Sequence, residues 1–176
     1  MGNMEAMSYY LIIAAAGHDT TSSSSSAGLL ELIRNPGELQ KLRDDPDLLP
    51  NAVDEMIRWS SPVKHFFRTA AADAEVGGMQ VKAGDGLVMA YPSANRDAAV
   101  FEDPFAFRVD RENVRQHLAF GYGPHLCLGQ HLAKMEMRIL FEELLARFDD
   151  FELAGEPAWT RASFVSGLKR LPIRYR

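Results

Sequence analysis

The segment from Phe120 to Gly129 surrounds the only cysteine of the chain, Cys127. It reads Phe-Gly-Tyr-Gly-Pro-His-Leu-Cys-Leu-Gly, with two glycines at two-residue spacing and a proline ahead of the sulfur. Such a loop bends sharply and lets its backbone approach a flat ligand closely. A cysteine presented in this way can be a nucleophile, a metal ligand or an inert side chain that packs like a small hydrophobe.

The residues that follow Cys127 have helical periodicity, which places the sulfur just before a long helix from Leu128 to Phe148. Backbone N–H groups of the loop and of the helix N-terminus favour the ionised thiol. The apolar side chains fall on two opposite faces, so we expect a helix that is buried on two sides. One face consists of Leu128, Leu132, Met135 and Ile139, and the other of Met137, Leu140, Phe141 and Leu144.

Further helices are expected upstream of this loop. Tyr9 to Arg34 is predicted as one long helix that ends at Asn35-Pro36. Its middle, Ser22 to Ser26, has small side chains that let a bulky group lie close to the backbone. Gly37 to Arg43 and Asn51 to Trp59 are predicted as two more helices, with Asn51 as the N-cap of the second.

The pattern changes after Pro62, where glycines separate short apolar runs. Met79 to Val81 and Leu87 to Tyr91 are predicted as strands, and Pro92 to Leu118 as ordered coil. A last β-hairpin is expected around Ser166-Gly167. Together these elements predict a fold that is mainly α with small β-sheets.

The composition excludes several classes of protein. The chain has 176 residues, of which 47% are hydrophobic, and carries a net charge of −5 without a dense Lys/Arg run. Nucleic acid is therefore not expected as a partner. The longest apolar run, Tyr9 to Ala16, is too short to span a bilayer. One cysteine excludes an internal disulfide framework and a multi-cysteine zinc site, and a cytoplasmic location is expected.

The spacing Phe-x-x-Gly-x-His-x-Cys-x-Gly resembles the haem-binding loop of the cytochrome P-450 monooxygenases. Two other segments resemble the same family, in the family's order. Ala16-Gly17-His18-Asp19-Thr20-Thr21 is similar to its oxygen-activating distal helix, and Glu55-Met56-Ile57-Arg58 to its Glu-x-x-Arg pair. Glu-x-x-Arg alone is a weak signal, because such pairs are common on helices. In detail the chain is similar to soluble bacterial members, especially the monoterpene (α-terpineol) hydroxylase type.

The resemblance implies that Cys127 is the axial thiolate of haem b, iron protoporphyrin IX. It also implies that Thr20 hydrogen-bonds dioxygen and that Asp19 supplies protons. The alternative for this pair is a helix with a polar kink.

The same resemblance implies that His125 and Arg68 pair with the haem propionates, while Phe120 and Gly121 pack under the macrocycle. An arginine suits a propionate because its guanidinium can hold a carboxylate bidentately. The alternatives are a loop histidine satisfied by the backbone for His125 and a surface cation for Arg68.

Glu55, Arg58 and Arg111 are expected to form the family's buried charge network, with a structural role. Four apolar residues match segments that line the family's substrate pocket, and ordinary core packing is the alternative for them. These residues are Val63, Phe66, Phe164 and Val165.

The function implied is insertion of one oxygen atom of O2 into a C–H bond of a small hydrophobic substrate, with a terpenoid as one candidate. Electrons would come from NAD(P)H through a ferredoxin reductase and a ferredoxin, which would dock on Arg115, Lys134 and Arg138. Residues 1–176 would be a partial domain, since the family's N-terminal half is absent, so weak or no independent turnover is expected. The alternatives are an inactive haem-binding or interaction fragment and, less favoured, a cysteine nucleophile with His125 or His131 as base.

Overall fold

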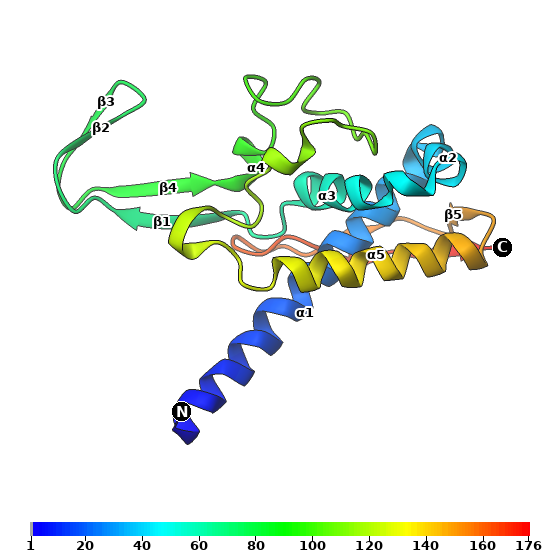
Figure 1. The fold of residues 1–176 in the computed structure, drawn as a ribbon, viewed down its shortest axis with the longest axis horizontal. Helices are drawn as coiled ribbons and strands as arrows, with labels where there is room; N and C mark the ends of the chain where they lie inside the picture. The colour runs from blue at the N-terminus through cyan, green and yellow to red at the C-terminus, as the bar shows by residue number, and fades with distance from the viewer. Residues whose placement is uncertain (1) are drawn as a thin grey trace.

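Helix α1 (Asn3–Arg34) is the longest element of the computed structural model, which describes residues 2–176. The prediction of one continuous helix through the serine tract is confirmed, although α1 begins before Tyr9. It ends where the N–H of Asn35 donates to the Glu31 carbonyl at 2.9 Å. Figure 1 shows the N-terminal part of α1 projecting away from the remaining elements, and only its C-terminal part packs against them.

Three short helical segments follow α1 and lead to the centre of the fold. They are α2 (Pro36–Asp44), the 3-10 helix η1 (Pro46–Leu48) and α3 (Leu49–Ser60). The predicted helices at these places are confirmed, but Asn51 is not an N-cap, because α3 starts at Leu49 with a proline in its first turn. The Asn51 amide instead donates to the carbonyls of Val109 and Arg111, at 2.8 and 3.1 Å.

Four short strands form two antiparallel pairs after α3. Strand β1 (His65–Thr69) pairs with β4 (Gly86–Ala90), and β2 (Ala74–Val76) pairs with β3 (Met79–Val81). The predicted strands β3 and β4 are confirmed, except that Tyr91 belongs to the next element. Strands β1 and β2 were not predicted. Figure 1 shows both pairs extending to one side of the helices.

The segment predicted as ordered coil is largely irregular. It contains most of the short helix α4 (Tyr91–Ala94) and one turn of 3-10 helix, η2 (Val114–Gln116). A second 3-10 turn, η3 (Gly123–His125), lies after it in the Cys127 loop.

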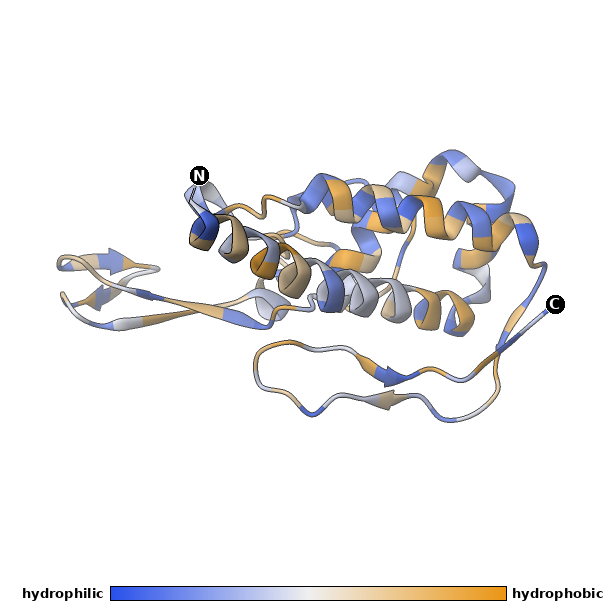
Figure 2. Ribbon diagram, turned by 90° about the horizontal axis from the view of Figure 1, so that it is seen from below, coloured by the Kyte–Doolittle hydropathy of each residue, from blue (hydrophilic) through white to orange (hydrophobic). Residues whose placement is uncertain are grey.

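Helix α5 (Gln130–Arg147) and four short strands complete the chain. Strand β5 (Phe151–Leu153) pairs with β8 (Ile173–Tyr175), and β6 (Ala158–Trp159) with β7 (Leu168–Arg170), so the predicted C-terminal hairpin is confirmed. Figure 2 shows these strands as an extended ribbon beside the helices.

The core lies around α3, which packs against the C-terminal part of α1, the irregular segment and α5. Its buried side chains include Leu32, Leu42, Val53, Met56, Ile57, Phe107, Val109, Met137 and Phe141. The expectation that α5 is buried on two sides is wrong. Met137 and Phe141 are buried against the core, whereas Leu128 is 91% exposed and Leu132 51% exposed, because no described element covers their face.

The serine tract of α1 accommodates protein rather than a bulky ligand at its centre. The Ser60 hydroxyl of α3 donates to the Ser24 hydroxyl at 3.1 Å. Gly167 of the C-terminal hairpin lies so close to Ser23 that a side chain at 167 would overlap it. Small residues at these places let α3 and the hairpin approach the α1 backbone.

Replacing Gly28 by alanine is expected to lower the free energy of unfolding by about 1–3 kcal/mol, because Met56 of α3 already occupies the space beside Gly28. A methyl group at Gly28 of α1 would lie 2.5 Å from Met56 Cγ and 2.9 Å from Met56 Cβ of α3. Urea unfolding followed by circular dichroism measures the change. The matched control is Gly37→Ala in α2, where nothing lies within 4 Å of the added group. Equal stability of the two variants would contradict the close contact between α1 and α3.

Candidate functional site

The loop that carries Cys127 owes its shape to two glycines with positive φ. Gly121 has φ +74° and Gly123 φ +69°, a backbone region that residues with a side chain rarely adopt. The Cys127 N–H donates to the Phe120 carbonyl at 2.9 Å and the Leu126 N–H to the Gly123 carbonyl at 3.0 Å. The loop thus closes on itself and delivers Cys127 three residues before the start of α5.

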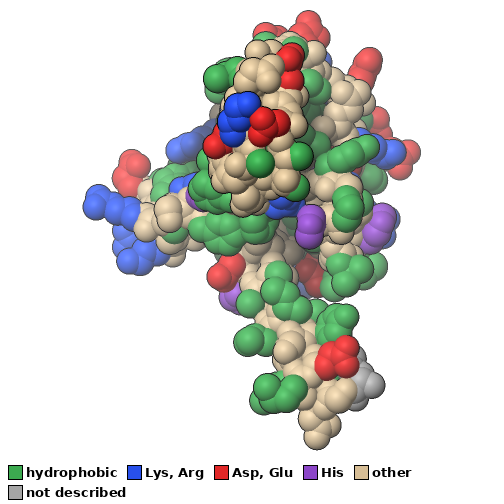
Figure 3. All heavy atoms as spheres, turned by 90° about the vertical axis from the view of Figure 1, so that its left-hand side faces the viewer, with side chains coloured by type: hydrophobic (Ala, Val, Ile, Leu, Met, Phe, Trp, Pro, Cys, Tyr) green, Lys and Arg blue, Asp and Glu red, His purple; other side chains and the backbone are tan. Residues whose placement is uncertain are grey.

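The Cys127 thiol is free and exposed, and apolar side chains around it are exposed as well. Tyr122 is 85% and Leu126 46% exposed, beside the uncovered Leu128. Figure 3 shows further hydrophobic side chains along the projecting part of α1 and on the face from which it emerges. An exposed thiol among exposed apolar groups suits contact with an apolar ligand better than with water.

Asp19 and Thr20 lie on α1, where its exposed part meets the packed part. The Thr20 hydroxyl donates to the Ala16 carbonyl of its own helix at 2.7 Å. Asp19 is exposed, and its carboxylate lies 2.9 Å from His18 Nδ1. In this arrangement both side chains make contacts within α1, and Asp19 remains accessible.

Arg68 and His125 are exposed basic side chains without an acidic partner among the described residues. Among the described residues, the Arg68 guanidinium donates only to the neighbouring Phe67 carbonyl, at 2.8 Å. Across residues 2–176, neither side chain forms an ion pair. Both are therefore free to bind the carboxylates of a ligand.

These features fit a haem with a thiolate ligand. The described residues hold no cluster of three or more His, Cys, Asp or Glu side chains that could bind a metal ion. The Cys127 loop offers one sulfur, exposed apolar side chains around it and a backbone without a side chain at Gly121. Arg68 and His125 offer basic side chains that could bind propionates. One protein ligand is enough for iron that a porphyrin already holds.

Glu55, Arg58 and Arg111 form a completely buried charge network. Arg58 contacts both carboxylate oxygens of Glu55, with Nε 2.7 Å from Oε2 and Nη2 2.8 Å from Oε1. Arg111 Nε lies 3.2 Å from the same Oε2. The guanidiniums also donate to backbone carbonyls of the irregular segment, including Asn95 at 2.6 Å and Ala106 at 2.7 Å. The network therefore fixes the irregular segment on α3.

A second cluster of charged and polar side chains lies beside this network, centred on the buried Asp54. The sequence alone did not reveal it. Asp54 Oδ1 lies 3.3 Å from His117 Nε2 and 2.5 Å from Lys134 Nζ. His117, without a role in the sequence interpretation, is buried. The signal that could have revealed this group is Asp54 itself, a charged residue amid the apolar stripe of α3 and directly before Glu55.

The pKa of the Asp54 carboxyl lies below its usual value. Burial raises this pKa, but hydrogen bonds from His117 and Lys134 and the positive charge of Lys134 lower it by more. Arg115 Nε, 3.9 Å from Asp54 Oδ2, is the third basic group at this carboxylate.

The Asp54→Asn variant is expected to be less stable than the parent by about 1.5–3 kcal/mol at neutral pH. Since the folded-state pKa is lowered, the ionised Asp54 stabilises the fold above about pH 5, and this contribution disappears as the pH falls through that pKa. The difference in unfolding free energy between the two proteins should therefore shrink on acidification, in urea titrations between about pH 7 and pH 2. A difference that does not change with pH would contradict an ionised Asp54.

The cations expected to dock a ferredoxin differ in their surroundings. The Lys134 side chain is 33% exposed and contacts the Asp54 carboxylate, and its role as a docking cation stays a prediction. The Arg115 side chain is 78% exposed. Arg138 is half-exposed, with Nε 3.7 Å from the Glu142 carboxylate.

The four predicted pocket residues lie together. Val63 and Val165 form an antiparallel bridge, and the Phe66 and Phe164 rings meet edge to face with centroids 5.3 Å apart. Both rings are exposed, Phe66 by 45% and Phe164 by 43%, so they form an open apolar patch rather than ordinary core.

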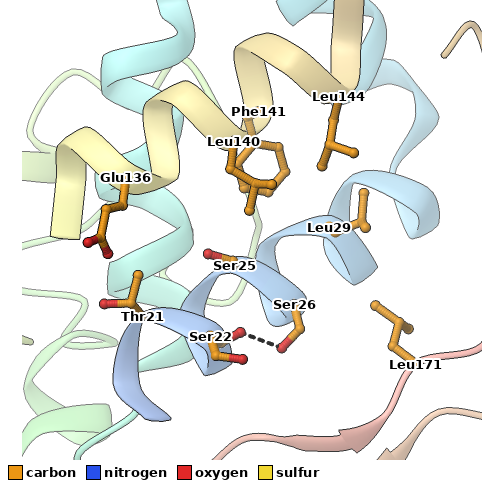
Figure 4. Close-up of a pocket in the computed structure, with 10 residues that line it drawn as sticks. All are labelled: Thr21, Ser22, Ser25, Ser26, Leu29, Glu136, Leu140, Phe141, Leu144 and Leu171. Carbon is orange, nitrogen blue, oxygen red and sulfur yellow. Dashed lines mark hydrogen bonds between the residues drawn. The ribbon is translucent and has the colours of Figure 1, made fainter. Parts of the chain in front are cut away.

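Two hollows among the described residues lie elsewhere. One of about 480 Å³ is lined by Thr21, Ser25 and Leu29 of α1 and by Glu136 and Leu140 of α5 (Figure 4). The other, of about 730 Å³, is lined by residues that include Trp59, Lys64, Arg96 and Trp159. Neither hollow contains Cys127 or the open apolar patch.

Comparison with known proteins agrees with the geometry of the cysteine loop. The family model described as Cytochrome P450 matches residues 1–171. The chain belongs to the cytochrome P450 family. Within the described residues, no helix is long and apolar enough to cross a membrane.

Individual P450 proteins match nearly the whole chain. Cytochrome P450-terp from a Pseudomonas species is 53% identical over 168 residues, which cover 96% of this chain and 39% of that protein. Linalool 8-monooxygenase from Pseudomonas putida is 43% identical over 145 residues, which cover 82% of this chain and 36% of that protein. The chain thus spans well under half the length of these P450 relatives.

A solved P450 structure has the same fold over the shared part. The crystal structure of CYP108D1 from Novosphingobium aromaticivorans superposes with a TM-score of 0.90 at 50% identity, covering 96% of this chain and 41% of that one. The predicted fold, a partial P450 fold with helices and small sheets, is therefore confirmed.

Proposed function

We propose that this chain is the haem-binding portion of a P450 monooxygenase, with Cys127 as the thiolate ligand of haem b. The observation that carries the proposal is the exposed Cys127 thiol in a loop shaped by two positive-φ glycines. When bound, a haem with a thiolate ligand activates O2, so that one oxygen atom enters a C–H bond and the other leaves as water. The cofactor supplies this chemistry, and the chain supplies binding, orientation and charge.

The chain's own residues would divide these tasks. Cys127 would hold the iron, Arg68 and His125 would pair with the propionates, and Phe120 and Gly121 would pack against the macrocycle. Thr20 would hydrogen-bond dioxygen once its hydroxyl turns away from the Ala16 carbonyl. The exposed Asp19 would pass protons from water toward that oxygen. Glu55, Arg58 and Arg111 would keep the fold around the site rigid.

The substrate would be small and hydrophobic, and a terpenoid is favoured. The open patch of Val63, Phe66, Phe164 and Val165 offers only apolar side chains. Linalool 8-monooxygenase, named for a reaction on the terpenoid alcohol linalool, is among the relatives. Electrons would come from NAD(P)H through a ferredoxin reductase and a ferredoxin, with Arg115, Lys134 and Arg138 as docking cations. The protein would act in the cytoplasm.

Residues 1–176 would act as one partial domain. The second candidate for its function is an inactive haem-binding fragment. Two observations favour this candidate for the isolated chain, namely the exposed apolar residues of α1 and the coverage of 39% of Cytochrome P450-terp. Exposed apolar surface of this extent promotes association.

Haemin titration, followed by reduction and exposure to CO, tests the proposal. A strongly red-shifted Soret band is expected, and its absence would contradict it. Turnover is then measured with linalool, NAD(P)H, a ferredoxin and its reductase. Little or no coupled product is expected from the 176-residue chain, and robust oxidation would overturn the inactive-fragment candidate. A hydrolase activity that thiol alkylation abolishes would instead assign Cys127 as a nucleophile.

A further inference from the structure

We propose that Asp54, His117 and Lys134 form a positioning network that holds Phe120 and, through it, the Cys127 loop. The inference deepens the proposed function, because it concerns how the chain orients its thiolate ligand. The three residues come from α3, from the end of η2 and from α5, so the network joins three separate segments at the base of the loop.

The first step is the contact between Asp54 and the basic groups around it. Asp54 is 3% exposed, and its carboxylate faces His117, Lys134 and the more distant Arg115. A buried carboxylate with two close partners has a fixed orientation, because any rotation would leave charge unpaired in a region of low dielectric. Asp54 therefore provides a fixed anchor on the rigid helix α3.

The second step is the orientation of the His117 ring. Its Nδ1 accepts a hydrogen bond from the Ala119 N–H at 3.3 Å, so in the neutral ring the proton resides on Nε2, which faces Asp54 Oδ1. His117 thus connects the α3 carboxylate with the backbone directly before Phe120. Its neighbour Leu118 is fixed too, since its N–H donates to Asn95 Oδ1 at 2.6 Å.

The third step is the enclosure of the Phe120 ring. The His117 ring lies on one side of it, at a centroid distance of 5.6 Å, and Lys134 Nζ lies 5.6 Å from its centroid. Lys134 binds Asp54 and Phe120 at once, so its salt bridge and its cation–π contact depend on each other. Both contacts fix the residue whose carbonyl accepts the Cys127 N–H at 2.9 Å.

Two variants and a matched control test the network. Lys134→Met removes the cation and keeps an apolar chain beside Phe120. Lys134→Arg keeps the positive charge and is expected to behave like the parent chain. The control is Lys82→Met, which removes an exposed Lys–Asp pair on the β2–β3 hairpin. Amide hydrogen exchange of the haem-free chain is measured first, followed by the Soret band of the reduced CO complex after haemin addition.

Lys134→Met is expected to speed exchange of the Cys127 and Ala119 amides about tenfold and to leave the core amide of Ile57 unchanged. The CO complex should then show a mixed Soret band, and Lys134→Arg should restore both readouts. Unchanged exchange at Cys127, or an equal increase at Ile57, would overturn the network. Because the exchange measurement needs no haem, failure of haem binding in the parent chain would contradict only the proposed function.

Discussion

Replacing Glu55 by glutamine is expected to lower the free energy of unfolding by about 3–5 kcal/mol. The carboxylate contacts both Arg58 and Arg111, and all three side chains are at most 3% exposed. Without it, two buried guanidiniums keep their positive charges with no anion nearby. Since domains are stable by only about 5–15 kcal/mol, this loss would leave much of the chain unfolded.

Urea unfolding, followed by circular dichroism, measures this loss. Glu143→Gln is the matched control, because Glu143 makes an i,i+4 pair with Arg147 on the exposed side of α5. A change within about 0.5 kcal/mol is expected for it, since exposed pairs contribute little. A Glu55 variant as stable as the Glu143 variant would show that the buried network does not hold the irregular segment.

Replacing Cys127 by serine is expected to abolish the red-shifted Soret band of the CO complex completely. Secondary structure should stay unchanged, because the side chain is exposed and the loop depends on the backbone bond from Cys127 to Phe120. Absorbance spectroscopy after haemin titration and reduction measures the first effect and far-ultraviolet circular dichroism the second.

His131→Ala is the control for this substitution. His131 is an exposed histidine in the first turn of α5, four residues after Cys127 in the sequence. The His131→Ala variant should retain the red-shifted Soret band if the Cys127 sulfur is the ligand. A CO complex of the parent chain without the red-shifted band, whose Soret band changes in His131→Ala but not in Cys127→Ser, would instead assign a nitrogen ligand.

The helices were predictable because their apolar spacing repeats over many residues. Strand β1 was not, since His65-Phe66-Phe67-Arg68 does not alternate between apolar and polar residues. Only its pairing with β4, with Phe67 opposite Val88, defines it as a strand. The second face of α5 was misjudged for a related reason: periodicity shows which residues share a face, but not whether another segment covers it.

The Cys127 loop was predictable from local sequence, because glycine spacing, proline and cysteine lie within ten residues. The Asp54 group was not, because Asp54, His117 and Lys134 are distant in sequence and meet only through packing of α3 against α5. Lys134 looked like a surface cation for the same reason, since nothing near it in sequence reveals its buried partner.

X-ray absorption at the iron edge of the chain loaded with haemin tests the central claim most directly. With Cys127 as the axial ligand, the spectrum should require one sulfur scatterer in the first shell besides the four porphyrin nitrogens, and this scatterer should be missing in Cys127→Ser. A first shell of nitrogen and oxygen alone in the parent chain would contradict thiolate ligation and with it the proposed monooxygenase function.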